Sequence, residues 1–153
     1  MYLFLLSLHS LFRWLVLLSL IISIVTAYRG WKGKSEFTSS ANSIRHWTAT
    51  IAHLQLLVGI TIYFQSPVII STMADGIYQL TVEQAFFKYI HLILMVLAIV
   101  VITIGSARAK RMTTAAAKYH TMLIWFAIAL VIIFIAIPWP FSFLATRPYI
   151  RPF

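Results

Sequence analysis

The sequence predicts an all-α integral membrane protein, an antiparallel four-helix bundle that forms a single domain over residues 1–153. Two observations carry this prediction. Apolar residues make up 61% of the chain and charged residues only 10%, whereas a soluble domain carries about 25% charged residues. In addition, four apolar runs are long enough to cross a bilayer as helices, which takes about 20 residues each, and polar connectors separate them.

The four spans are expected at residues 3–27, 44–64, 86–105 and 115–137. The second span should stop before Pro67, since proline biases its predecessor away from the helix. Residues 65–85 are then the longest loop, which carries Asp75 and, at Thr81–Gln84, a capping-box pattern that can start the third helix. Residues 138–153 follow the last span and are expected to be an aromatic tail at the membrane interface.

The distribution of basic residues predicts the orientation. Most lysines and arginines lie in the connectors 28–45 and 106–119, so the positive-inside rule places both connectors in the cytoplasm. The expected location is a bacterial inner membrane, crossed several times, with both termini in the periplasm. Because the +9 charge is divided among short connectors, it does not indicate nucleic acid. The absence of cysteine excludes disulfides, iron–sulfur clusters and c-type haem attachment.

Histidines are the most informative residues, and at least one falls on every span. His9 and His91 each lie roughly 7–9 Å from the same membrane face, on the first and third spans, at 1.5 Å of rise per residue. In an up-down bundle these spans occupy opposite corners. Both imidazoles can therefore point at one central site.

A second pair is expected on the other diagonal. His53 lies two helical turns beyond His46 on the same face of the second span. His120 reaches a similar depth to His53 if the fourth helix starts near Thr113, and the level of His46 if it starts at Lys118. His46 lies at the water boundary, where an interfacial anchor is its better interpretation.

Two opposed imidazoles inside a membrane indicate haem b, whose iron takes an axial nitrogen on each face of a flat apolar ring. A zinc or copper ion prefers three or four ligands close together. Proton relays normally include carboxylates, and no span contains one. Each histidine alone could be a hydrogen-bonded bundle residue, but their joint occurrence at paired depths predicts one or two haems.

Arg13 lies one turn after His9, inside the first apolar run. Its guanidinium could bind a haem propionate, or it could be held by backbone carbonyls or lipid headgroups. Lys88 is an alternative propionate partner, although a lysine at that position also fits ordinary snorkelling to the interface.

Several motifs resemble one family. They are residues 8–14 (LHSLFRW), residues 52–59 (AHLQLLVG), residues 102–105 before a basic turn, and residues 136–140 (AIPWP). Together they resemble small bacterial four-helix membrane proteins labelled cytochrome b-like, and more distantly bacterial cytochrome b561. The resemblance implies a haem-b electron carrier with His9, His53, His91 and His120 as ligands and with electrons exchanged with quinone.

Three functions compete at this point. The first is a b-type cytochrome that exchanges electrons with quinone or a larger respiratory complex; as an enzyme it would be a quinone-linked haem oxidoreductase or a subunit of one. The second is a cofactor-free accessory subunit of a membrane complex, for which the aromatic tail is suited. The third is a small-solute permease, which four helices could form only as a homo-oligomer. All three place the chain among membrane lipids.

Overall fold

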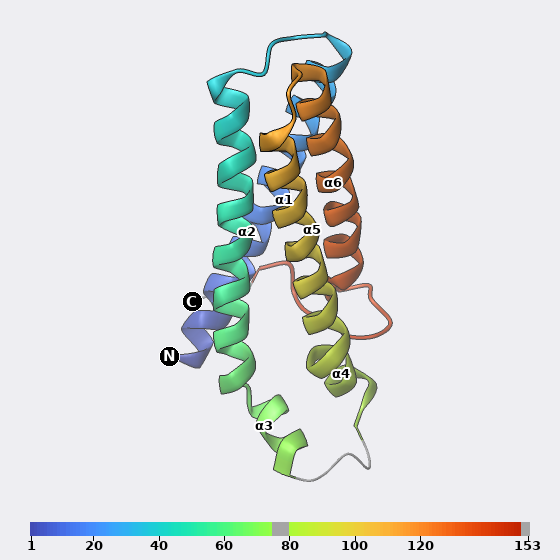
Figure 1. The fold of residues 1–153 in the computed structure, drawn as a ribbon. Coiled ribbons are helices and arrows are strands. Elements are labelled where there is room, and N and C mark those ends of the chain that lie inside the picture. The colour runs from blue at the N-terminus through green and yellow to red at the C-terminus, as the bar shows by residue number, and fades with distance from the viewer. Residues whose placement is uncertain (75–79, 151–153) are drawn as a thin grey trace.

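A computed structural model describes residues 1–74 and 80–150, with the side chains of 72–74 left aside (Figure 1). The helices are α1 (Tyr2–Lys32), α2 (Ser39–Gln65), α3 (Pro67–Ala74), α4 (Val82–Ala85), α5 (His91–Arg111) and α6 (Ala115–Ala136). A π-helical turn, Phe86–Ile90, joins α4 to α5 in one continuous helix. The described residues contain no strand.

Four helices are long and apolar enough to cross a membrane: α1, α2, the continuous helix Val82–Arg111, and α6. The predicted all-α membrane bundle is thereby confirmed. The helices extend beyond most of the predicted spans, and α1 continues to Lys32 rather than stopping near residue 27. A hydropathy pattern marks only the bilayer-embedded part of a helix, whereas the hydrogen-bonded backbone continues into water until a capping group ends it.

The predicted loop at residues 65–85 is partly wrong, because Pro67 begins a short helix, α3. The second span ends at Gln65, as the proline predicts, but proline is also favourable in a first helical turn, where its missing N–H has no partner to lose. The capping box is confirmed: Thr81 Oγ1 accepts from Gln84 N, and Gln84 Oε1 accepts from Thr81 N at 2.9 Å. Asp75 lies outside the described residues.

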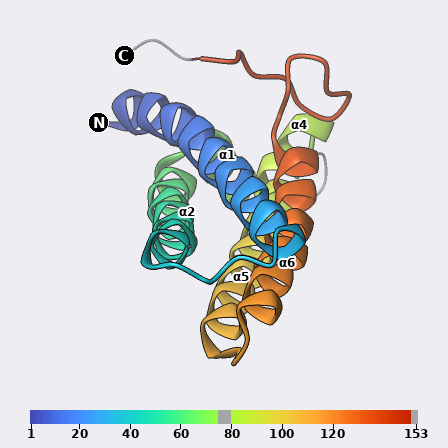
Figure 2. The same cartoon turned by 90° about the horizontal axis from the view of Figure 1, so that it is seen from above.

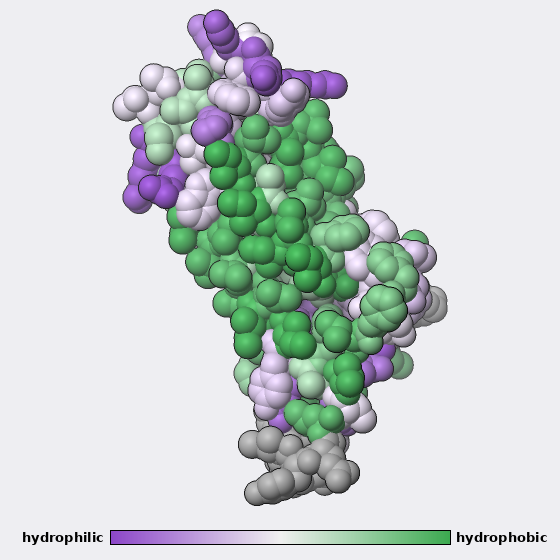
Figure 3. Space-filling model, turned by 90° about the vertical axis from the view of Figure 1, so that its right-hand side faces the viewer, coloured by the Kyte–Doolittle hydropathy of each residue, from purple (hydrophilic) through white to green (hydrophobic). Residues whose placement is uncertain are grey.

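The four spanning helices pack in the cyclic order α1, α2, α5, α6. Consequently α1 faces α5 across one diagonal and α2 faces α6 across the other, as expected (Figure 2). We call the end with the α1–α2 and α5–α6 connections the basic end, and the end where α1 begins and α6 finishes the tail end. Figure 3 shows hydrophobic side chains over the middle of one face and hydrophilic ones gathered at the basic end.

Polar bonds between helices lie on the inner face of α2. Ser23 and Thr48 share a buried hydrogen bond of 2.7 Å between α1 and α2. Closer to the basic end, the buried Arg45 donates to the hydroxyl and carbonyl oxygens of Ser106 on α5 and to Asn42 Oδ1. These bonds fix the rotation of α2, whose inner face is otherwise poor in large apolar side chains.

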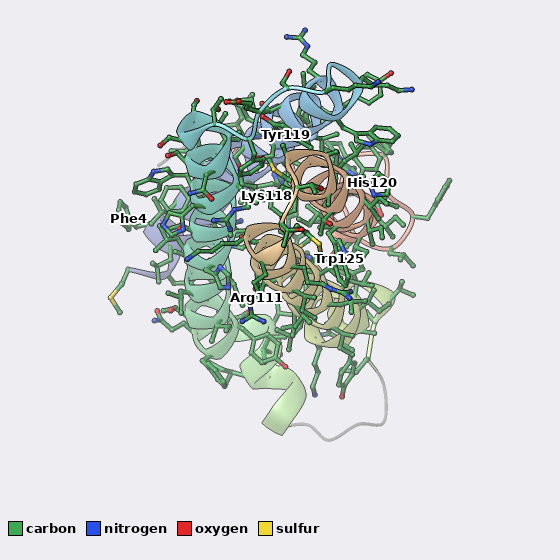
Figure 4. All side chains as sticks on the ribbon, turned by 45° about the horizontal axis from the view of Figure 1, so that its top comes forward. Phe4, Arg111, Lys118, Tyr119, His120 and Trp125 are labelled. Carbon is green, nitrogen blue, oxygen red and sulfur yellow. The ribbon has the colours of Figure 1, made fainter. Side chains whose placement is uncertain are left out.

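Glycines allow the closest helix contacts (Figure 4 labels the partner side chains Tyr119 and Trp125 on α6). A Cβ added at Gly30 would lie 2.3 Å from the Tyr119 ring. One added at Gly105 would lie 2.3 Å from the Cβ of Trp125, which cannot rotate away. The absent side chain of Gly105 is therefore what lets α5 and α6 pack at this separation.

We expect Gly105→Ala to destabilise the bundle by about 1–3 kcal/mol, because the new methyl overpacks the α5–α6 contact. Thermal unfolding in detergent, followed by helical circular dichroism, measures the loss as a lower Tm. Ile104→Val is the matched control: Ile104 is 41% exposed on the same helix and should change stability by only about 0.5 kcal/mol. An equal Tm for Gly105→Ala and wild type would contradict the close contact.

Candidate functional site: an opposed histidine pair

The structure brings His9 and His91 together across the α1–α5 diagonal. Their ring centroids are 6.4 Å apart and the rings are inclined at 68°. His9 comes from the third turn of α1, and His91 is the first residue of α5. The sequence predicts this pair from depth alone, and the opposed arrangement follows because α1 and α5 occupy opposite corners of the bundle.

The end of α6 orients His91. Its Nδ1 donates to the carbonyl oxygen of Ala136 at 2.8 Å, where the last helical carbonyls have no partner inside the helix. A carbonyl can only accept, so Nδ1 carries the proton and Nε2 keeps the lone pair in the neutral ring. This is the tautomer in which histidine binds a metal through Nε2.

A π-helical turn precedes His91, and such turns frequently occur at functional sites. The first residues of this turn place two aromatic rings beside His91. The centroid of Phe86, a fully buried side chain, lies 5.9 Å from the His91 ring, and that of Phe87 lies 6.1 Å from it. The aromatic pair excludes water from one side of the imidazole.

His9 lies against a glycine of α2. A Cβ added at Gly59 would be 3.0 Å from His9 Cε1 and 3.5 Å from its Nδ1. One turn earlier, Gln55 Nε2 donates to the backbone carbonyl of His9 at 3.0 Å. Two buried polar atoms here, His9 Nδ1 and Gln55 Oε1, have no partner among the described residues. The sequence analysis missed Gln55, although its position two residues after His53 on an apolar helix was a usable signal.

Arg13 contacts the C-terminal tail. Its guanidinium donates to the carbonyl oxygens of Pro148, at 3.4 Å, and Tyr149, while its charge interacts with both imidazoles of the pair. The neighbouring Trp14 donates through Nε1 to the same Tyr149 oxygen at 2.9 Å. Of the two roles expected for Arg13, the structure thus contains the bond to backbone carbonyls, and the propionate contact stays a prediction.

Residues 138–150 form what we call the tail strap, which runs beside the first turns of α1 (Figure 2). Its second attachment is Arg147, which pairs with Glu83 and places its guanidinium 4.6 Å from the centre of the Phe87 ring. Since Phe87 contacts His91, the strap covers the tail end of the histidine pair. The predicted tail extends to residue 153, and its last three residues, including Arg151, lie outside the described part.

His53 and His120 are not brought together, and they do not share a depth: His120 lies beside Trp31 at the basic end of α1, whereas His53 lies five residues beyond Thr48, which is level with Ser23. His53 is exposed and bonds to Ala49 O at 2.6 Å through Nδ1 and to Thr103 Oγ1 at 3.1 Å through Nε2. His120 is exposed beside Trp31, with ring centroids 5.1 Å apart, on the side of α6 away from α2 (Figure 4). A paired site needs a matching depth and a matching direction. The first depends on where each helix begins and the second on the 100° that each residue adds to the rotation of a helix, and the sequence pattern determines neither closely enough.

The remaining candidates have ordinary surroundings. His46 is exposed beside Trp47, with ring centroids 6.0 Å apart, as expected for an interfacial anchor. Lys88 is buried, and its Nζ lies 5.5 Å from the centre of the Tyr89 ring. Among residues 1–74 and 80–150, no group of three His, Asp or Glu side chains is placed to hold a metal ion.

An apolar groove of about 610 Å³ opens on the outer side of the bundle between α1 and α6, in the half nearer the strap. Leu17 and Trp139 are its most buried members. The rest of the lining consists of Trp14, Leu18, Ile21, Leu130, Val131, Phe134 and Ile135. The sequence could not reveal this groove, because its residues look like any lipid-facing surface.

The fold and the site together define a helical membrane bundle with a half-buried, opposed histidine pair. Comparisons of the chain with protein-family models, with curated proteins and with solved structures find no match. The function is therefore argued from the geometry of the pair.

We expect Trp14→Phe to loosen the strap without unfolding the bundle, because the change removes the Nε1 donor to Tyr149 and part of the ring contact with Trp139, both of which belong to the strap. A single lost hydrogen bond is worth about 1 kcal/mol, so amide hydrogen exchange in residues 140–149 should rise several-fold while that of α6 stays unchanged. Trp47→Phe, which alters an exposed tryptophan at the basic end, is the control. Unchanged exchange in the strap would show that Trp14 does not hold it.

Proposed function

We propose that this chain is a b-type cytochrome of the membrane that holds one haem b between His9 and His91. The observation that supports this proposal is the distance between the centroids of the two imidazole rings. A transition-metal ion takes an imidazole nitrogen at about 2.0–2.1 Å, so two imidazoles on opposite sides of one ion have centroids roughly 6 Å apart. The measured separation is 6.4 Å.

Three further features favour this ligand set. His91 already has the Nδ1–H tautomer, held by Ala136. His9 has a buried Nδ1 that no protein atom satisfies. The adjoining helices α2 and α5 are the least closely packed neighbours in the bundle, and their axes diverge toward the tail end (Figure 1).

Haem b, when bound, supplies a one-electron Fe(III)/Fe(II) couple. His9 and His91 would hold the group through one ring nitrogen each. Phe86 and Phe87 exclude water from the His91 side, and the strap covers the tail end of the pair. The Arg13 charge favours the less positive, reduced state of any ion held between the two rings.

His53 and His120 are left out of this proposal, since each is exposed and occupied by other contacts. A single haem is thus the stoichiometry that the arrangement supports. We further propose that the basic end faces the cytoplasm of a bacterium, as the positive-inside rule predicts, which puts the haem near the periplasmic side.

The decisive measurement is an absorption spectrum of protein purified from a haem-sufficient host. We expect a Soret band and a reduced α band, with a pyridine haemochrome assay that gives one haem per chain. His9→Ala and His91→Ala should each abolish or strongly reduce the haem content. The controls are His46→Ala, His53→Ala and His120→Ala, which should retain it.

Two outcomes of this experiment would contradict the proposal. A colourless wild-type protein would exclude haem binding. Equal haem loss in the His53 or His120 variant would show that the ligands are not the pair described here.

A cofactor-free accessory subunit is the second candidate, and the strap favours it. Phe143 and Ile150 are 102% and 71% exposed, and exposed large apolar side chains outside the bundle are typical of a surface that meets a partner. For this function the His9 and His91 variants should assemble with their partner normally, whereas deletion of residues 141–150 should release the chain from a larger membrane complex.

Quinone is the electron partner that we propose, because it dissolves in the same membrane and the α1–α6 groove can take an apolar isoprenoid chain. Each quinol that is oxidised gives up two electrons and two protons, and so reduces the iron of two chains.

Leu130→Trp fills the groove and should slow haem reduction by a long-chain quinol in stopped-flow measurements, with haem content unchanged. Ile128→Trp, outside the groove on the same helix, is the control. Equal rates for both variants would exclude the groove as the quinone site.

A further inference from the structure

We propose that Gln55 is a positioning residue for His9: its side-chain carbonyl accepts the Nδ1 hydrogen of His9 and so directs Nε2 to the metal. The proposal rests on the function proposed above and adds to it a residue on α2 that binds no cofactor itself. Gln55 acts on the reaction only through His9.

The first argument is that two complementary polar atoms lie unpaired in one place. His9 Nδ1 and Gln55 Oε1 are both buried without a protein partner. Their residues already touch, because Gln55 Nε2 donates to the His9 carbonyl at 3.0 Å. A buried polar atom with no hydrogen bond costs about 1–3 kcal/mol, and a small rotation of the amide that joins Nδ1 to Oε1 would satisfy both atoms at once.

The second argument is the direction of the ring. Gly59 lies one helical turn after Gln55, on the same face of α2. From the position of a Cβ at Gly59, His9 Cε1 is 3.0 Å away and Nδ1 3.5 Å away, whereas Nε2 is more than 4 Å away. The Nδ1 edge of the imidazole therefore faces the Gln55–Gly59 side of α2, and Nε2 is the nitrogen turned from it.

The third argument is the opposite histidine. His91 donates its Nδ1 hydrogen to an amide carbonyl, that of Ala136. Metal-binding histidines almost always bond the second ring nitrogen in this way, which fixes the tautomer and strengthens the nitrogen that binds the metal. Gln55 offers His9 the same chemical group, supplied by a side chain instead of the backbone. Unlike the backbone carbonyl of Ala136, the side-chain carbonyl of Gln55 can be removed by mutation.

The test uses the haem-loaded protein and two substitutions with opposite expected effects. Gln55→Leu keeps the size of the side chain and removes the acceptor, so His9 becomes a weaker ligand. The midpoint potential should rise, and the affinity for haem should fall about 10- to 100-fold. Gln55→Glu gives a stronger acceptor, which favours Fe(III), so the potential should fall while haem is retained. Gln65→Leu, at the end of the same helix, is the control and should change neither quantity.

The outcomes separate this inference from the proposed function. A colourless wild-type protein overturns the haem proposal and this inference with it. A coloured wild type whose potential is unchanged in both Gln55 variants overturns the inference alone. Shifts of the same sign in both variants would also overturn it, because they would indicate altered packing instead of a hydrogen bond. If Gln55→Leu does not fold, the sign of the Gln55→Glu shift against wild type still decides the question.

Discussion

The constraint on which this structure depends is that a bilayer interior offers no water to polar atoms, so each must find a partner within the protein. The bonds between helices follow from it: Ser23 with Thr48, Arg45 with Ser106, and His91 with the final carbonyl of α6. Against this background the unsatisfied His9 Nδ1 stands out. Among the described residues, Gln55 Oε1 on α2 is likewise without a partner, so both of these atoms lie beside the histidine pair.

The fold could be predicted from the sequence because membrane thickness fixes helix length. Four apolar runs and short connectors determined the number of spans and the two diagonals, and depth placed His9 level with His91. The side of the helix on which each residue lies could not be predicted in the same way. His53 and His120 face outward, since the helices around them are apolar on all sides and the pattern does not mark an inner face. The helix at Pro67 and the contacts of Gln55 were also missed, because both depend on tertiary packing and not on composition.

Arg13 connects the tail strap with the histidine pair. Its guanidinium bonds to the strap through the Pro148 and Tyr149 carbonyls, and its charge acts on both imidazoles. Holding the strap therefore also holds a positive charge at a fixed place near the pair. An arginine one turn from His9 thus anchors the strap and also carries a charge close to the pair.

The strap has a consequence for biosynthesis. Because it follows α6 in the chain, it leaves the ribosome after all four spanning helices. During membrane insertion the tail end of the bundle is consequently uncovered, and it is covered only when Tyr149 reaches Trp14. Any bulky group that enters from that end has to arrive before the polypeptide finishes folding, so the order of synthesis itself sets a time limit on loading.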